Sequence, residues 1–259
     1  APYPVPVLAL LTMQCLAGRA VTAAAMGRWR GCATVALNPL KVLPSSVRIY
    51  ELAPRDGLQN EPTAVPTSAK LRLIEMLGDA GVAAIEATSF VSPKWVPQMA
   101  DHKEILAGLQ QVPGVEYPIL VPNLKGFQGA AAAGASTVAV MTIPSESFAR
   151  RNLNCTVQQT VERALEIIRA AHLAGVRVRG YISCALGCPF EGAIDPAKVA
   201  ELATLLDEAG CYEVCLADTI GTGTAGSMNA LLQVAPRTHT LTHARTRSRS
   251  RKHTLTHTH

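Results

Sequence analysis

The sequence predicts an α/β barrel, and three observations support this fold class. From Val47 onward, apolar strand-like runs alternate with helical segments. Several of these helices end in a glycine that a strand follows, which is the joint of a βα repeat. Polar and charged side chains gather in or just past the carboxyl ends of the strands, and in a barrel those ends meet on one face. A doubly wound sheet fits the same alternation, but it would bring only two or three of these groups together.

The alternation defines six strands and six helices. The predicted strands are Val47–Ala53, Ala83–Thr88, Tyr117–Val121, Thr137–Ile143, Val176–Ser183 and Tyr212–Ala217. The predicted helices are Ser68–Asp79, Met99–Gln111, Lys125–Ala133, Val157–Ala174, Pro196–Glu208 and Ala225–Val234, with N-caps predicted at Thr67, Thr156 and Asp195. A (β/α)8 barrel has eight such units. Residues 47–234 therefore predict an incomplete TIM barrel with six of the eight units present.

Charge divides the chain into three regions. The net charge is +5, but all 19 acidic residues lie within residues 51–234. This body is therefore acidic, and the basic excess lies at the two ends, so the total charge does not indicate a nucleic-acid surface on the folded part. No apolar run reaches about 18 residues, which predicts no membrane span. The seven cysteines are an odd number in a large chain, which favours reduced thiols.

Residues 1–46 have the composition of a leader. They are rich in Ala, Val and Leu, contain arginines and contain no acidic residue. This predicts a mitochondrial transit peptide and a location in the mitochondrial matrix. The apolar run Val5–Leu11 leaves a short secretory signal open, and a leader without function is a further alternative.

Residues 235–259 differ from the rest of the chain. They alternate Thr, His, Arg and Ser without a core-facing period, and they hold five of the seven histidines. We interpret this stretch as a disordered basic tail that arises from mis-splicing or read-through. A nucleic-acid-binding arm is the alternative, but no aromatic residue accompanies the arginines.

The stretch Arg55-Asp56-Gly57 joins a cation, a metal ligand and a turn where the first predicted strand ends. Arg55 carries a permanent charge and five donors. Asp56 is a hard oxygen ligand suited to Mg²⁺ or Mn²⁺. These residue types suit a site where negative charge develops on a substrate oxygen. A surface ion pair beside a turn is the alternative interpretation.

Longer motifs extend this observation. Pro54 to Glu61, Thr88 to Met99, Tyr117 to Phe127, Gly180 to Pro189 and Asp218 to Gly221 together resemble the 3-hydroxy-3-methylglutaryl-CoA lyase family. The resemblance runs from about Val47 to about Val234. Other aldolase-type metal enzymes, such as isopropylmalate and homocitrate synthases, share only the Arg-Asp-Gly kernel.

The resemblance implies an aldolase-type TIM barrel that cleaves 3-hydroxy-3-methylglutaryl-CoA into acetyl-CoA and acetoacetate with a divalent metal, Mg or Mn. It implies catalytic roles for Arg55, Glu86 and Asp218, and Asp56 as a metal ligand. It also implies substrate binding by Arg55, Gln59, Ser89, Tyr181 and Thr219. The expected partner is a small acyl-CoA molecule, with neither nucleic acid nor membrane, and the full-length relatives are expected to be homodimers.

The chain also departs from the family pattern. The family takes further metal ligands from a His-x-His pair on its seventh strand, which by register falls near Arg247 and Arg249. His257-Thr258-His259 has the right spacing, but no apolar strand precedes it. The sequence therefore leaves two hypotheses: a mitochondrial metal-dependent lyase, or a non-catalytic and unstable splice or read-through product. Another aldolase-type acyl-CoA metal enzyme is a further possibility.

Overall fold

The computed structural model describes residues 46–235 and 241–242. All of them belong to one compact unit. The predicted leader lies outside the described residues except for its last residue. Within residues 46–235, every helix is too short or too polar to span a bilayer.

The strands are short and all their pairings are parallel. They are β1 (Tyr50–Glu51), β2 (Ala84–Ile85), β3 (Thr88–Ser89), β4 (Ile119–Leu120), β5 (Thr137–Thr142), β6 (Arg177–Ile182), β7 (Glu213–Leu216) and β8 (Leu241–Thr242). β1 pairs with β2, and β3 to β8 follow one another in a six-stranded sheet. A parallel bridge between Ala84 and Glu116 links the two sheets. Strand order therefore follows chain order, as in a TIM barrel, and among the described residues no pairing joins β8 to β1 to close it.

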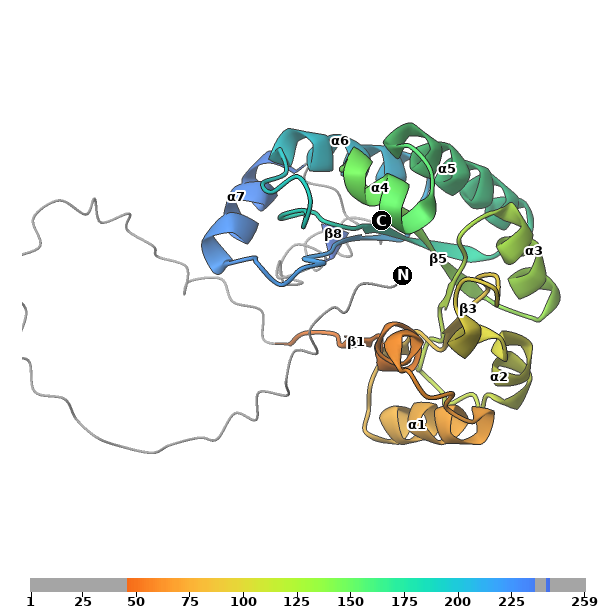
Figure 1. The fold of residues 1–259 in the computed structure, drawn as a ribbon. Coiled ribbons are helices and arrows are strands. Elements are labelled where there is room, and N and C mark those ends of the chain that lie inside the picture. The colour runs from red at the N-terminus through yellow and green to blue at the C-terminus, as the bar shows by residue number, and fades with distance from the viewer. Residues whose placement is uncertain (1–45, 236–240, 243–259) are drawn as a thin grey trace, which may run out of the picture. The chain divides into compact units, whose positions relative to one another are not determined.

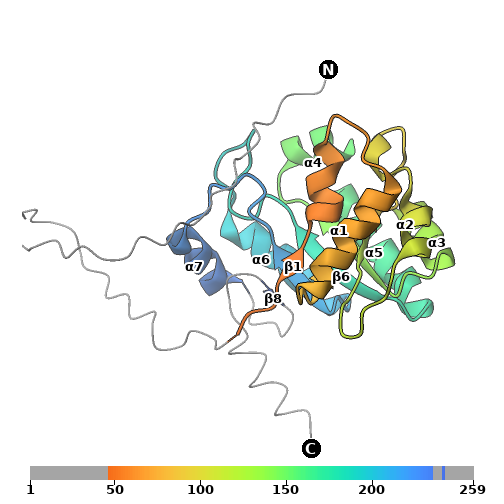
Figure 2. The same cartoon turned by 90° about the horizontal axis from the view of Figure 1, so that it is seen from below.

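The helices alternate with the strands. They are α1 (Thr67–Asp79), α2 (His102–Gly108), α3 (Leu124–Ala132), α4 (Glu146–Leu153), α5 (Val157–Leu173), α6 (Pro196–Glu208) and α7 (Ala225–Val234). In Figure 1, α3, α5, α6 and α7 lie along the outer side of the curved sheet. Figure 2 shows α1, α2 and α3 gathered at one end of the unit and α6 and α7 at the other. This is the layering of a barrel with helices outside.

The six predicted strands and six predicted helices are confirmed, with ends that shift by a few residues. The Thr156 and Asp195 caps are confirmed, since each side chain accepts a backbone N–H of its helix. The Thr67 cap is wrong. Pro66 occupies the cap position, and the Thr67 hydroxyl donates instead to Asp101 at 2.8 Å.

Two elements differ from the expectation. The eight-residue helix α4 was missed because it is short and polar, and Ser145 caps it by accepting the Phe148 N–H. β8 lies within residues 235–259, where no regular structure was predicted, and its Leu241 pairs with Val214 of β7. Without β8, the edge of β7 would leave backbone N–H and C=O groups unpaired, and a short extended segment can pair with them. Most other residues of that stretch lie outside the described part, so its disorder stays a prediction.

Alternation along the strands separates an apolar face from a polar one. The side chains on the apolar face pack with the helices in the core, and they include Ile85, Ala87, Val178, Ile182, Val214 and Leu216. The intervening positions carry Glu86, Arg179, Tyr181 and Glu213, which contact one another on the inner side of the sheet. The barrel interior is therefore lined by charged and phenolic side chains.

Glu86 lies at a break between two strands. β2 ends at Ile85 and β3 begins at Thr88, and the segment between them stays tied on both sides. The Glu86 N–H donates to the Glu51 carbonyl at 2.8 Å, and the Ala87 N–H donates to the Pro118 carbonyl at 3.2 Å. Because both neighbouring strands hold this backbone, the Glu86 side chain points inward from a fixed position.

Gly126 at the start of α3 offers a stability test. A Cβ at this position would lie 2.8 Å from the Phe90 carbonyl oxygen and 3.0 Å from the Pro122 Cδ. Backbone has little room to move, so we expect Gly126→Ala to lower the free energy of unfolding by about 1–3 kcal/mol. Urea denaturation of the chain measures this change.

The matched control is Gly226→Ala in α7. Its Cβ would meet only Thr224 Oγ1 at 3.6 Å. Because alanine has a higher helix propensity than glycine, this variant should raise the free energy of unfolding by up to about 1 kcal/mol. Equal effects of the two substitutions would contradict the close approach at Gly126.

Candidate active site

Hydrogen bonds fix the backbone of the turn after β1, and this turn places the Arg55 side chain in the interior. Ala53–Gly57 form one π-helical turn, and the N–H groups of Arg55, Asp56 and Gly57 all donate to the Leu52 carbonyl. The Glu51 carboxylate accepts the N–H of Leu52 at 2.8 Å and that of Ala53 at 2.7 Å. These bonds fix the backbone where the strand ends, and Arg55 is left 5% exposed.

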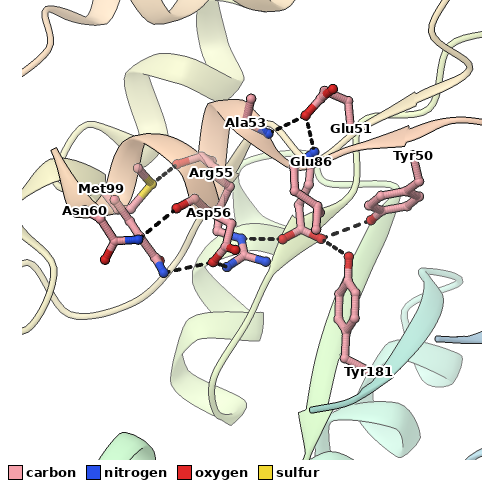
Figure 3. Close-up of polar contacts among 12 residues, drawn as sticks. Tyr50, Glu51, Ala53, Arg55, Asp56, Asn60, Glu86, Met99 and Tyr181 are labelled. Carbon is pink, nitrogen blue, oxygen red and sulfur yellow. Dashed lines mark hydrogen bonds and ion pairs between the residues drawn. The ribbon is translucent and has the colours of Figure 1, made fainter. Parts of the chain in front are cut away.

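Arg55 lies between two carboxylates (Figure 3). Its Nε donates to Glu86 Oε1 at 2.5 Å, and its Nη1 donates to Asp56 Oδ1 at 2.6 Å. Burial alone would lower the pKa of Arg55, but Glu86 and Asp56 raise it above its ordinary value. The guanidinium is therefore a fixed, permanently charged group at the carboxyl end of the first strand.

Glu86 is completely buried and uses both oxygens. Oε1 takes the bond from Arg55, and Oε2 accepts the hydroxyls of Tyr181 at 2.7 Å and Tyr50 at 3.1 Å. Burial and the nearby Glu86 raise the pKa of both phenols, so they stay protonated donors. A buried carboxylate needs such partners, because an unpaired one is costly.

Arg179 lies behind the two phenols. Its guanidinium carbon is 4.0 Å from the Tyr50 ring centroid and 4.6 Å from that of Tyr181. Its Nε donates to Glu213 Oε1 on β7 at 2.6 Å. Arg179 is 4% exposed, so these cation–π contacts are shielded from water and correspondingly stronger.

Asp56 is the outer member of the cluster. Its Oδ1 accepts Gln59 Nε2 at 2.9 Å as well as Arg55, and its side chain is 51% exposed. A half-exposed carboxylate fits one position of a divalent cation site. No group of three His, Cys, Asp or Glu side chains that would hold a metal occurs among the described residues. The described part therefore does not form a metal centre by itself.

The remaining predicted site residues make other contacts within the described part. Asp218 accepts the backbone N–H groups of Thr222 at 3.2 Å and Gly223 at 2.7 Å, so its carboxylate shapes the loop after β7. Thr219 accepts the Cys184 N–H at 2.7 Å. Ser89 is 2% exposed at the end of β3, and its hydroxyl has no hydrogen-bond partner within the part of the chain that the structure describes.

The structure thus brings Arg55, Asp56, Gln59, Glu86 and Tyr181 together in one hydrogen-bonded network. It shows no hydrogen bond from Asp218, Thr219 or Ser89 to this network within residues 46–235. Sequence reasoning missed Tyr50 and Arg179. Both lie at inward positions of strands. The available signal is a large polar residue inside an apolar strand, which Arg179 gives between Val178 and Gly180, whereas Tyr50 is followed by the charged Glu51.

A second cluster lies at the end of β6. Cys188 Sγ is 3.0 Å from Ser145 Oγ, and Cys184 has a left-handed backbone with φ of 58°. Burial and the neighbouring Cys188 raise the pKa of the Cys184 thiol to about 12. The five cysteines in the described part are free thiols, as predicted. Cys184 is therefore a buried, protonated thiol at neutral pH, which is unsuited to act as a nucleophile.

The class of protein follows from fold and site together. Parallel strands run in barrel order with helices outside, and a buried cation and its carboxylates occupy the carboxyl ends of the first two strand segments. This is an incomplete α/β barrel of the aldolase type, with a polar site on the face where barrel enzymes carry out their chemistry.

The chain belongs to the HMGL-like family, whose family model matches residues 46–245. This match extends past Val234, where the resemblance was expected to stop, and it includes β8.

Individual proteins show the same relationship. The chain is 54% identical over 213 residues to the Bos taurus protein named hydroxymethylglutaryl-CoA lyase, mitochondrial, covering 81% of this chain and 66% of that protein. It is 54% identical over 196 residues to the Mus musculus protein named 3-hydroxy-3-methylglutaryl-CoA lyase, cytoplasmic, covering 76% of this chain and 57% of that protein. The crystal structure of hydroxymethylglutaryl-CoA lyase from Pseudomonas aeruginosa superposes with a TM-score of 0.72 at 52% identity, covering 74% and 64%. The chain thus spans between 57% and 66% of the length of these three proteins.

Proposed function

We propose that this chain carries the first part of the active site of a carbon–carbon lyase that cleaves 3-hydroxy-3-methylglutaryl-CoA into acetyl-CoA and acetoacetate. The observation that carries the proposal is the buried Arg55 guanidinium, held by Glu86 at the carboxyl end of β1. Family membership and the names of the relatives support the substrate class. The product chemistry connects the reaction to ketone-body formation and leucine degradation.

The reaction requires a base and a group that stabilises negative charge. The tertiary hydroxyl of the substrate loses its proton, and its oxygen becomes the ketone of acetoacetate. The bond between the hydroxyl-bearing carbon and the thioester's α-carbon breaks, and its electron pair becomes the enolate of acetyl-CoA. A proton then adds to that carbon. A fixed cation beside the enolate oxygen lowers the barrier to this cleavage.

Arg55 suits the enolate oxygen, because its charge is permanent and its position is set before substrate binds. Glu86 uses both oxygens on Arg55 and the two phenols, so we assign it the role of holding Arg55. Asp218, on the loop after β7, remains our candidate for handling protons. We propose that Gln59, Ser89, Tyr181 and Thr219 contribute to substrate binding. The unpartnered, buried Ser89 hydroxyl supports its inclusion.

We propose Asp56 as one ligand of a divalent cation, Mg²⁺ or Mn²⁺, since it is a hard oxygen donor with half its surface exposed. Such a cation, when bound, would polarise the substrate's oxygens. The other ligands must come from outside the described residues. The full-length relatives are proposed to be homodimers, and neither nucleic acid nor membrane is a proposed partner.

The decisive experiment is a chimera. Residues 46–235 replace the matching segment of the Bos taurus lyase, and acetyl-CoA and acetoacetate are measured with Mg²⁺, with Mn²⁺ and with a chelator. We expect metal-dependent cleavage that forms both products in equal amounts. A folded chimera that binds metal yet forms neither product would contradict the proposed function.

A second candidate is that the 259-residue chain is itself non-catalytic. The observation that favours it is that no group of three His, Cys, Asp or Glu side chains able to hold a metal occurs in the described part. We expect the chain assayed alone to show no cleavage above background with either cation. Metal-dependent turnover by this chain would rule the second candidate out and would show that residues outside the described part complete the site.

We propose mitochondrial targeting by the acid-free residues 1–50, although the relatives bear both mitochondrial and cytoplasmic names. Fused behind an initiator Met and ahead of a fluorescent reporter, these residues should direct it to mitochondria. Replacing Arg19, Arg28 and Arg30 by Gln should abolish this import, because transit peptides need positive charge. A diffuse cytosolic signal from the unaltered fusion would contradict the proposal.

A further inference from the structure

Tyr50 occupies a position to which the proposed chemistry gives no role. It lies on β1, five residues before Arg55, and its hydroxyl donates to Glu86 Oε2 at 3.1 Å. Tyr181 reaches the same oxygen from β6 at 2.7 Å, and the two rings meet edge to face with centroids 6.5 Å apart. One carboxylate oxygen is thus held by phenols from two different strands (Figure 3).

Arg179 keeps the two rings in place. Its guanidinium carbon lies 4.0 Å from the Tyr50 centroid and 4.6 Å from the Tyr181 centroid. Glu213 on the neighbouring strand accepts from Arg179 Nε at 2.6 Å and fixes the guanidinium in turn. The phenols therefore have little freedom to turn away from Glu86, since their rings are bound on a face by a buried cation.

This arrangement determines where the other oxygen of Glu86 points. A carboxylate held at one oxygen by a single donor can still swing about that bond. Two donors from different strands, approaching the same oxygen, restrict this swing and fix the plane of the carboxylate. Oε1 is then directed at Arg55 Nε, which it contacts at 2.5 Å.

We propose that Tyr50 is a positioning residue: together with Tyr181, and clamped by Arg179, it sets the Glu86 carboxylate and through it the direction of the Arg55 guanidinium. Its relevance to catalysis rests on the proposed function of Arg55. The geometry itself can be measured without turnover, so a failure of this inference and a failure of the proposed function are distinguishable.

The test uses the full chain with ¹⁵N-labelled arginine. The Nε–H resonance of Arg55 is assigned by its loss in Arg55→Lys, and its chemical shift and hydrogen exchange are then followed in Tyr50→Phe. This variant removes one oxygen and keeps the ring that contacts Arg179. We expect a changed shift and exchange at least about tenfold faster, the order expected when a hydrogen bond to a charged group is lost.

A second test variant and a matched control accompany Tyr50→Phe. Tyr181→Phe removes the other phenol and should change the same resonance. Tyr117→Phe is the matched control, because its hydroxyl contacts the Gln110 carbonyl at 3.3 Å and lies outside the network. It should leave the Arg55 signal unchanged. An Arg55 resonance with the same shift and exchange in Tyr50→Phe as in the unaltered chain would overturn the inference.

Discussion

Replacing Arg55 by Gln in the chimera should lower kcat by about 100-fold or more, with metal binding retained. The reason is that the guanidinium supplies a fixed positive charge where we place the enolate oxygen, and loss of one such donor has effects of this order. Gln keeps a donor but not the charge. The measurement is a coupled acetyl-CoA assay at saturating substrate, with metal affinity determined separately.

The control for this prediction is Arg72→Gln. Arg72 also pairs with a carboxylate, Glu75 at 2.7 Å, but its side chain is 63% exposed on α1. Its replacement should leave kcat within about twofold, since exposed ion pairs contribute little. Near-normal turnover of the Arg55→Gln chimera would show that the enolate charge is stabilised elsewhere.

Replacing Glu86 by Ala should destabilise the chain by about 3–5 kcal/mol, because it leaves the buried Arg55 without its main partner. The hydroxyls of Tyr50 and Tyr181 lose their acceptor in the same step. A domain has only about 5–15 kcal/mol of net stability, so this loss is a large fraction of the total. Urea denaturation followed by circular dichroism measures the change.

Glu75→Ala is the matched control for this prediction, because it removes a carboxylate from the exposed pair on α1 and should cost less than about 1 kcal/mol. The double variant Arg55→Met with Glu86→Leu should recover the part of the loss that comes from the unpaired Arg55 charge, since apolar residues of similar volume can replace a buried pair, whereas the two phenols still lack their acceptor. If Glu86→Ala unfolds at the same urea concentration as the unaltered chain, the pair is not a source of stability.

The fold was predictable because its signal is repeated. Alternating apolar segments and glycine-ended helices predicted every strand from β1 to β7 and six of the seven described helices. The exceptions are short. α4 has eight residues, about two helical turns, and β8 has two, so each repeats its pattern too few times to be recognised in the windows that reveal periodicity.

The site was predictable where residues adjoin in sequence and unpredictable where strands bring them together. Arg55, Asp56 and Gln59 stand within five positions, and they form one network. Tyr50 and Arg179 meet only because β1 and β6 face the same interior. The role of Asp218 stays a prediction: its place at a strand end suggested chemistry, and in the structure its carboxylate accepts backbone N–H groups of its own loop.

The buried carboxylate of Glu86 has a consequence for how the proposed site would respond to substrate. Three side chains converge on its two oxygens, so the Arg55 guanidinium is oriented when the chain folds and not when substrate arrives. A guanidinium that is already in place needs no reorientation as negative charge develops beside it, whereas water molecules would have to turn. The same rigidity limits what the site accepts. Under the proposed function, the substrate must bring its thioester oxygen to the Arg55 guanidinium. A substrate whose thioester is displaced by about an ångström would lose this contact, because the guanidinium is held in place.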